Sequence, residues 1–211
     1  MSKIKMFFLL LFSICSVGLL AQSNVVLSPA EQSKLQTQIE NVHQSLTTMK
    51  VHFIQEKHSD LFVEPMVQEG EMLYKSPDKL KWHYQTPQEM TLIFNEKQIL
   101  LKQAGKWIEN PNKMLGELGQ LIIQTINGKN LQKSPHFETK YEKNRNGQIE
   151  IVLLPLAKRL KSFYKEIRVV LEKDKFVASQ VIMKEANNDV TKIVFSKHQL
   201  NIEISEQNFT K

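Results

Sequence analysis

Short segments in which apolar and polar residues alternate dominate this chain, and they constrain its fold more than any other feature. In residues 79–85, Leu80, Trp82 and Tyr84 share one side of an extended chain while their neighbours are polar. Comparable segments occupy residues 51–56, 67–75, 90–94, 98–103, 137–143, 148–154, 164–172, 176–184, 190–197 and 200–204. Turn residues such as Asn146-Gly147 separate most neighbours, with no helical segment between them. The sequence therefore predicts an antiparallel sheet of about 11 strands.

A helix is expected at residues 29–48, because the chain before it carries the signals of a helix N-terminus. Ser28 is a capping residue, Pro29 suits the first helical position, and Glu31 stands three residues after the serine. Apolar residues then follow at spacings of three and four, which places on one helical stripe Leu35, Ile39, Val42, Leu46 and Met49. One face of this helix should therefore be buried.

A second helix is expected to begin at Asn110-Pro111 and to end at Asn127-Gly128. Its broad apolar stripe includes Leu118, Leu121 and Ile122. Gly116 and Gly119 each lower its helix propensity by roughly 1 kcal/mol relative to alanine. We therefore expect this helix to depend on tertiary contacts and to be mobile.

The first 21 residues differ from the rest and are expected to form a cleavable signal peptide. Lys3 and Lys5 precede 15 residues without charge, a stretch shorter than the about 20 apolar residues of a membrane-spanning helix. An uncleaved anchor is one alternative, and a lipidated N-terminus at Cys15 is disfavoured because the bulky Ile14 precedes it. Residues 22–211 would then form one exported domain without cysteine, with a formal charge of +4 because two lysines are lost from +6.

No motif of the sequence indicates catalysis or metal binding. The six histidines form no His-x-x-x-His pair, so we expect most of them at the surface. Nucleophile elbows and phosphate-binding glycine loops are absent from the sequence. Glu69 and Glu71 could form an acid–base pair, but solvent-facing glutamates on a strand are the commoner arrangement. Basic residues are spread along the chain, which argues against nucleic-acid binding. We expect a protein that is not an enzyme and that has no cofactor.

A sheet of this length has room to curl into an incomplete, half-open antiparallel barrel. Each expected helix has one apolar face that only the sheet can cover, so the two helices should lie across the trough as a lid. The predicted fold class is therefore α+β. Periodicity does not distinguish a packed interior from a hydrophobic cavity, and on the pattern alone a packed core is the commoner arrangement.

Several ordered motifs resemble those of the LolA-type outer-membrane lipoprotein carriers. Phe53-Ile54-Gln55 resembles the family's Phe-x-Gln, and residues 70–77 resemble its Gly-x-Leu-x-x-x-x-Pro. Residues 80–84, centred on Trp82, resemble its apolar-x-Trp-x-apolar motif and are followed by Pro87 without a gap in spacing. Residues 118–128 resemble the apolar lid helix, and residues 152–155 resemble a late Leu-x-Pro strand end.

The resemblance implies a monomeric periplasmic carrier of acylated lipoproteins or lipids, which an inner-membrane transporter complex loads and an outer-membrane acceptor unloads. The side chains expected to line its cavity are Phe53, Met72, Tyr74, Leu80, Trp82 and Tyr84 on strands, with Leu35, Ile39, Leu118, Leu121 and Ile122 on helices. The position at which the family has a lid-latching arginine holds Ser76, whose short side chain does not replace a guanidinium. A lipid-sensing or regulatory module of the envelope, and a carrier of another acylated product, remain alternatives.

Overall fold

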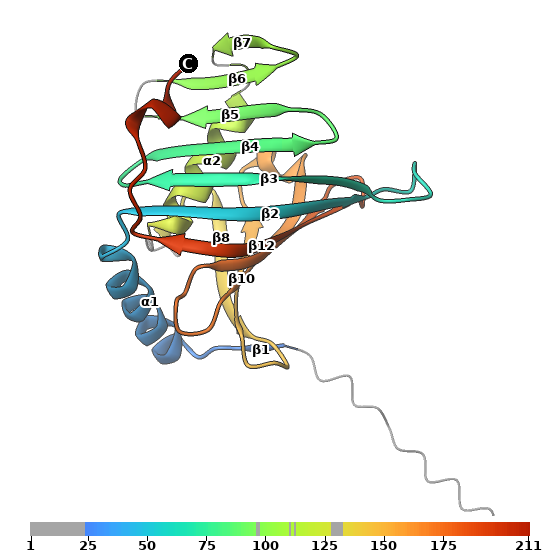
Figure 1. Cartoon of the computed structure of the whole chain (residues 1–211). Coiled ribbons are helices and arrows are strands. Elements are labelled where there is room, and N and C mark those ends of the chain that lie inside the picture. The colour runs from blue at the N-terminus through green and yellow to red at the C-terminus, as the bar shows by residue number, and fades with distance from the viewer. Residues whose placement is uncertain (1–23, 96–97, 110, 112, 128–132) are drawn as a thin grey trace, which may run out of the picture.

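The computed structural model describes residues 24–95, 98–109, 111, 113–127 and 133–211, so the expected signal peptide lies outside the described residues. Twelve strands of this described part form one antiparallel sheet in the order β1-β8-β9-β10-β11-β12-β2-β3-β4-β5-β6-β7 (Figure 1). The strands are β1 (Val25–Val26), β2 (Thr48–His58), β3 (Met66–Lys75), β4 (Lys79–Thr86), β5 (Met90–Phe94), β6 (Ile99–Gln103), β7 (Lys106–Glu109), β8 (Phe137–Lys143), β9 (Ile149–Pro155), β10 (Tyr164–Leu171), β11 (Ala178–Glu185) and β12 (Val190–Leu200).

Two meanders make up this sheet and meet in its middle. Strands β2 to β7 pair each with the next, as do β8 to β12, and β12 then pairs with β2. This central pair sets Phe195 opposite Phe53 and Ile193 opposite Gln55. The last strand, β12, therefore lies beside β2, and β1 and β7 remain as the two unjoined edges of the sheet.

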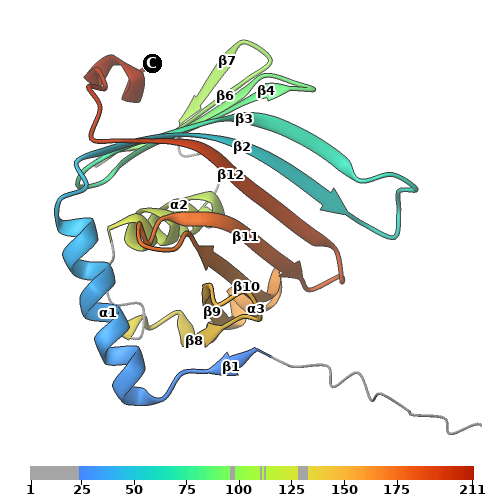
Figure 2. The ribbon, with the colours of Figure 1, turned by 60° about the horizontal axis from the view of Figure 1, so that its bottom comes forward.

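The sheet curls around its helices (Figure 2). Helix α2 (Lys113–Ile126) lies inside the curve, and α1 (Pro29–Gln44) runs along one side of it. A short helix α3 (Lys158–Lys161) connects β9 with β10, and the 3₁₀ turn η2 (Glu206–Phe209) packs on the outer face of the sheet against Ile93 and Leu100. The predicted α+β fold with a half-open antiparallel barrel is confirmed.

Helix α1 begins where the sequence predicts, because both halves of the capping box form. Glu31 N–H donates to the Ser28 hydroxyl at 3.4 Å, and Ser28 N–H donates to a Glu31 carboxylate oxygen at 2.8 Å. The helix ends at Gln44, four residues before the predicted end at 48. Thr48 and Met49 instead pair with Lys75 and Tyr74, so β3 draws this segment into the sheet.

Three other predictions differ from the structure at particular turns. The alternating pattern did not predict β7, which follows a hairpin turn with positive φ angles at Ala104 and Gly105. It also missed β1, a two-residue strand that pairs with β8. The predicted strand at residues 200–204 is wrong, because Asn201 has a left-handed φ of 56° and ends the extended chain. The predicted cap Asn110 and the predicted stop Gly128 lie outside the described residues.

Candidate functional site

An apolar cavity of about 100 Å³ lies between α2 and the inner face of the curved sheet. Its lining includes Leu121 and Ile122 from α2, Met72 and Trp82 from β3 and β4, and Val181 and Ile193 from β11 and β12. Apart from two histidines and a threonine, the lining side chains are apolar. Such a cavity favours hydrocarbon, because each methylene group removed from water contributes about 0.8 kcal/mol.

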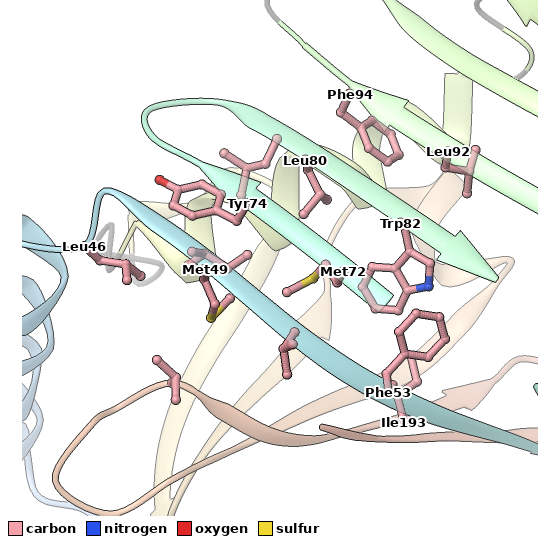
Figure 3. Close-up of a cluster of buried hydrophobic side chains, with 14 residues drawn as sticks. Leu46, Met49, Phe53, Met72, Tyr74, Leu80, Trp82, Leu92, Phe94 and Ile193 are labelled. Carbon is pink, nitrogen blue, oxygen red and sulfur yellow. The ribbon is translucent and has the colours of Figure 1, made fainter. Parts of the chain in front are cut away.

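The structure places the predicted cavity residues in three groups. Met72, Trp82, Leu121 and Ile122 line the cavity itself. Phe53, Tyr74 and Leu80 lie fully buried in the hydrophobic cluster behind them (Figure 3). The partly buried Tyr84 packs against that cluster. Leu35 and Ile39 belong to a second cluster, which α1 forms with β8, β9 and β10 and which also contains Leu121. Leu118 lies on α2, but its side chain is outside the described residues.

Sequence reasoning missed the wall of the cavity that the second half of the chain supplies. Val169, Val181 and Met183 line it, together with Ile193 and Phe195 of β12. The alternation in β10 places Ile167, Val169 and Leu171 on one face and predicts a strand with one apolar side. It does not predict whether that side packs against a core or lines a cavity. Only the pairing of β12 with β2 brings this wall opposite Met72 and Trp82.

Aromatic side chains pack together on the inner face beside the cavity. The ring centroids of Phe53 and Trp82 lie 4.7 Å apart, and those of Phe53 and Tyr84 lie 5.2 Å apart with perpendicular planes. Gly70 makes room for them, because a Cβ atom at this position would lie 2.9 Å from Phe53 Cζ and inside the backbone of His83. The glycine of the family-like motif is thus required by packing across β2, β3 and β4.

The two glycines of α2 bring this helix close to the sheet. A Cβ atom at Gly116 would lie 2.7 Å from Ile99 Cδ1, and one at Gly119 would overlap the ring of Phe94. Phe94 is the last residue of β5, and Ile99 is the first residue of β6. The glycines that weaken the helix in isolation therefore permit the contact that holds it in place.

Contacts at the end of α2 fasten it to both neighbouring elements. Asn127, one residue past the helix, accepts a hydrogen bond from the Tyr74 hydroxyl and donates one of 2.7 Å to the Pro77 carbonyl oxygen. Ser76, at the position of the family arginine, donates its backbone N–H to Thr47 at 2.8 Å. The Ser76 side chain is hydrogen-bonded to Tyr74, and the two hydrogen bonds to Asn127 come from Tyr74 and Pro77.

His43 is a buried polar residue at the cavity, and it is an exception to the expectation that most of the histidines lie at the surface. Its side chain on α1 is 6% exposed, and its ring nitrogens face the carbonyl oxygens of Ile126 and Phe176, the latter at 2.9 Å. Burial lowers the pKa of His43, while these two hydrogen bonds oppose part of the shift. The ring is therefore mainly neutral near pH 7.

The described residues do not favour an acid–base pair formed by Glu69 and Glu71. Glu69 and Glu71 lie on the outer face of the sheet, where they contact His52 at 2.7 Å and Lys50 at 3.0 Å. Among the described residues, no group of three or more His, Cys, Asp or Glu side chains could hold a metal ion. Nor does any helix within the described ranges have the length and apolarity to cross a membrane.

A half-open barrel closed by a helix over an apolar cavity defines a class of binding proteins for hydrophobic ligands. Residues 44–211 match the family described as outer membrane lipoprotein carrier protein LolA, and the chain belongs to this LolA family. The resemblance in residues 53–87 is thereby confirmed. No curated protein matches the chain.

The chain is similar to several solved structures at low sequence identity. A domain described as outer membrane lipoprotein-sorting protein, from Vibrio parahaemolyticus, is 11% identical, with a TM-score of 0.50 over 85% of this chain and 97% of that chain. A LolA superfamily protein from Nitrosomonas europaea is 8% identical, with a TM-score of 0.48 over 85% and 97%. The lipoprotein LppX of Mycobacterium tuberculosis is 12% identical, with a TM-score of 0.45 over 85% and 99%.

Proposed function

We propose that this protein is a periplasmic carrier that binds the acyl chains of lipoproteins in its apolar cavity and ferries them from the inner to the outer membrane. One observation carries this proposal: an almost wholly apolar cavity lies under helix α2, whose end is held by hydrogen bonds of Asn127 and His43. Acyl chains do not leave membranes unaided, because each buried methylene contributes about 0.8 kcal/mol to retention. A carrier must offer comparable apolar surface to accept them.

Uptake of an acyl chain requires α2 to move. The cavity of about 100 Å³ is smaller than the roughly 300–1,000 Å³ of pockets that hold drug-sized ligands. Displacement of Leu121 and Ile122 with α2 would join the cavity to the exterior and enlarge it. The signal peptide at residues 1–21 would deliver the protein to the periplasm. There it would act as a monomer between an inner-membrane transporter complex and an outer-membrane acceptor.

A cavity-filling variant tests this proposal, because it leaves the apolar character of the site intact. Val181 lines the cavity, whereas the next residue, Ile182, points to the opposite face of β11. Val181→Trp should abolish binding of a fluorescent acylated peptide, and the matched Ile182→Trp should bind like the wild type. Equal binding by both variants would show that the cavity is not the binding site.

An experiment that measures removal of an acylated peptide from vesicles distinguishes a carrier from a lipid-sensing module. The wild-type protein should remove an acylated peptide from donor vesicles and deliver it to acceptor vesicles, at a rate that rises with protein concentration. Binding without net transfer, together with a stable protein partner in the envelope, would favour the regulatory alternative.

A further inference from the structure

The connection between β2 and β3 carries large apolar side chains that the protein leaves in solvent. It spans residues 59–65, and Figures 1 and 2 show it projecting beyond the ends of the neighbouring strands. At its tip, Leu61 is 84% exposed, Phe62 54% and Val63 100%. Three consecutive apolar side chains with this exposure are unfavourable in water, so the tip needs an apolar partner.

The base of this connection is anchored to the turn between β11 and β12. The Ser59 hydroxyl is hydrogen-bonded to Asp189, the last residue of that turn. Lys57, near the end of β2, pairs with the Asp189 carboxylate at 3.3 Å and with Glu185 at 2.9 Å. The exposed tip therefore projects from a base that side-chain contacts hold in place.

Local hydrogen bonds satisfy two backbone donors of the tip. Phe62 N–H donates to the Ser59 carbonyl oxygen at 3.1 Å, and Leu61 N–H donates to the Ser59 hydroxyl at 3.3 Å. Pro65, two residues after Val63, has no N–H to satisfy. Because an unpaired N–H group is costly in an apolar medium, these bonds reduce the cost of moving the tip from water into lipid.

The charges around the tip indicate shallow insertion without electrostatic attraction. Asp60 and Glu64 stand directly on either side of the three apolar residues. Charged side chains are costly in hydrocarbon, so they limit penetration to the boundary between head groups and acyl chains, about 5–10 Å deep. Lys57, the nearest lysine in the sequence, is already paired with two carboxylates. Binding would therefore depend on burial of the apolar side chains.

A lipid bilayer fits this surface better than a protein partner does. A protein would need a pocket that surrounds a projecting tip, whereas fluid lipid covers such a tip from every side. We propose that Leu61, Phe62 and Val63 insert into the head-group region of a membrane and hold the protein there while an acyl chain moves between bilayer and cavity. Residues 59–65 do not line the cavity, so only the use of this contact in transfer rests on the proposed function.

Sedimentation with phosphatidylcholine vesicles tests the insertion. The wild-type protein should bind these vesicles, and high salt should not weaken the binding, because it depends on apolar burial. A triple variant with Leu61→Ser, Phe62→Ser and Val63→Ser should bind at least about tenfold more weakly. Ile108→Ser is the matched control, at a 46% exposed position on the edge strand β7, and should bind like the wild type. Circular dichroism should show that both proteins are folded.

Tryptophan fluorescence provides the second readout, which locates the tip in the bilayer. Brominated phosphatidylcholine should quench the added fluorescence of Phe62→Trp but not that of Ile108→Trp. The wild-type protein measures the background of its own two tryptophans, Trp82 and Trp107. Equal quenching of the two variants would show that the tip does not enter the bilayer.

The outcomes separate the membrane contact from the proposed function. The triple variant should bind an acylated peptide in solution like the wild type, but should transfer it between vesicles about tenfold more slowly, in proportion to its weaker vesicle binding. If the wild-type protein inserts but binds no acylated peptide, the proposed function fails and the membrane contact remains.

Three results would overturn the membrane contact. The first is a wild-type protein that does not bind phosphatidylcholine vesicles, and the second is a triple variant that binds them equally well. The third is binding to phosphatidylglycerol vesicles alone that high salt abolishes, which would indicate a basic surface elsewhere. Capture of an envelope protein that requires the tip, without vesicle binding, would assign the tip to a protein partner instead.

Discussion

The imidazole of His43, next to the last residue of α1, is hydrogen-bonded to the backbone carbonyl oxygen of Ile126, the last residue of α2. Its other nitrogen faces the carbonyl oxygen of Phe176, in the connection between β10 and β11, at 2.9 Å. A single buried ring thus ties both helices to the second half of the sheet. A neutral imidazole has only one N–H, so it can donate to one of these carbonyls at a time.

Acidification should destabilise the protein through His43. The pKa of His43 in the folded protein lies below the value of 6.5 expected for the unfolded chain, so the unfolded chain binds more protons as the pH falls below 6.5. The stability contributed by neutral His43 is complete above that value and is lost as the pH falls through the folded pKa. Urea unfolding at pH 7.5, 6.5 and 5.5 should show this loss, and His43→Gln should reduce it. The exposed His136 offers the control, since His136→Gln should keep the wild-type dependence.

Removal of Asn127 should loosen α2. Asn127→Ala leaves the Tyr74 hydroxyl and the Pro77 carbonyl oxygen without this partner, which should cost about 1–3 kcal/mol of folding free energy. Hydrogen exchange of the α2 amides should accelerate, and acyl-ligand association should become faster. Gln120→Ala, at an exposed position of the same helix, should leave the exchange rates unchanged. Unchanged exchange in Asn127→Ala would show that this contact does not hold the lid.

The two glycines of α2 should differ in their tolerance of alanine. Alanine adds about 1 kcal/mol of helix propensity at either position. At Gly119 the new methyl group would overlap the Phe94 ring, so overpacking of about 1–3 kcal/mol should outweigh that gain. At Gly116 it meets only the end of the Ile99 side chain, which can turn away. The thermal unfolding temperature of Gly119→Ala should therefore be lower than that of Gly116→Ala. The reverse order would contradict the close packing of α2 on β5.

The aromatic cluster should carry much of the stability of the first meander. Phe53 is 0% exposed and packs against Trp82 with the two rings tilted, so Phe53→Ala should cost about 3–5 kcal/mol in urea unfolding. Phe62, in the β2–β3 loop, is 54% exposed, and Phe62→Ala should change stability by less than about 0.5 kcal/mol. Similar losses in both variants would mean that the cluster is not the centre of the fold.

Local patterns predict most of the strands, because many of them, such as β4, show one face to the core and the other to solvent. The same alternation predicts Leu80, Trp82 and Tyr84 on the inner face, and the capping box predicts the start of α1. What the patterns do not contain is the pairing of distant segments. The cavity wall at Val181 and Ile193 depends on the β12–β2 pair, and nothing local distinguishes it from an ordinary core.

His43 shows a second limit of sequence reasoning. A polar residue next to an apolar helical stripe is usually solvated, and only the arrival of Ile126 and Phe176 from distant parts of the chain buries it. The glycines of α2 were expected to make the helix mobile, whereas the structure shows that they also permit its closest contact with the sheet. In both cases the sequence reveals the unusual residue, and the tertiary structure reveals its role.

Mass spectrometry of the lipids recovered from the purified mature protein tests the central claim most directly. The account predicts that the wild-type protein, expressed with export, carries acyl esters or amides at up to one molecule per chain. The Val181→Trp protein, purified in parallel with Ile182→Trp as the control, should carry none. A wild-type protein that holds no acylated molecule, and that takes up none when offered an acylated peptide, would contradict the account.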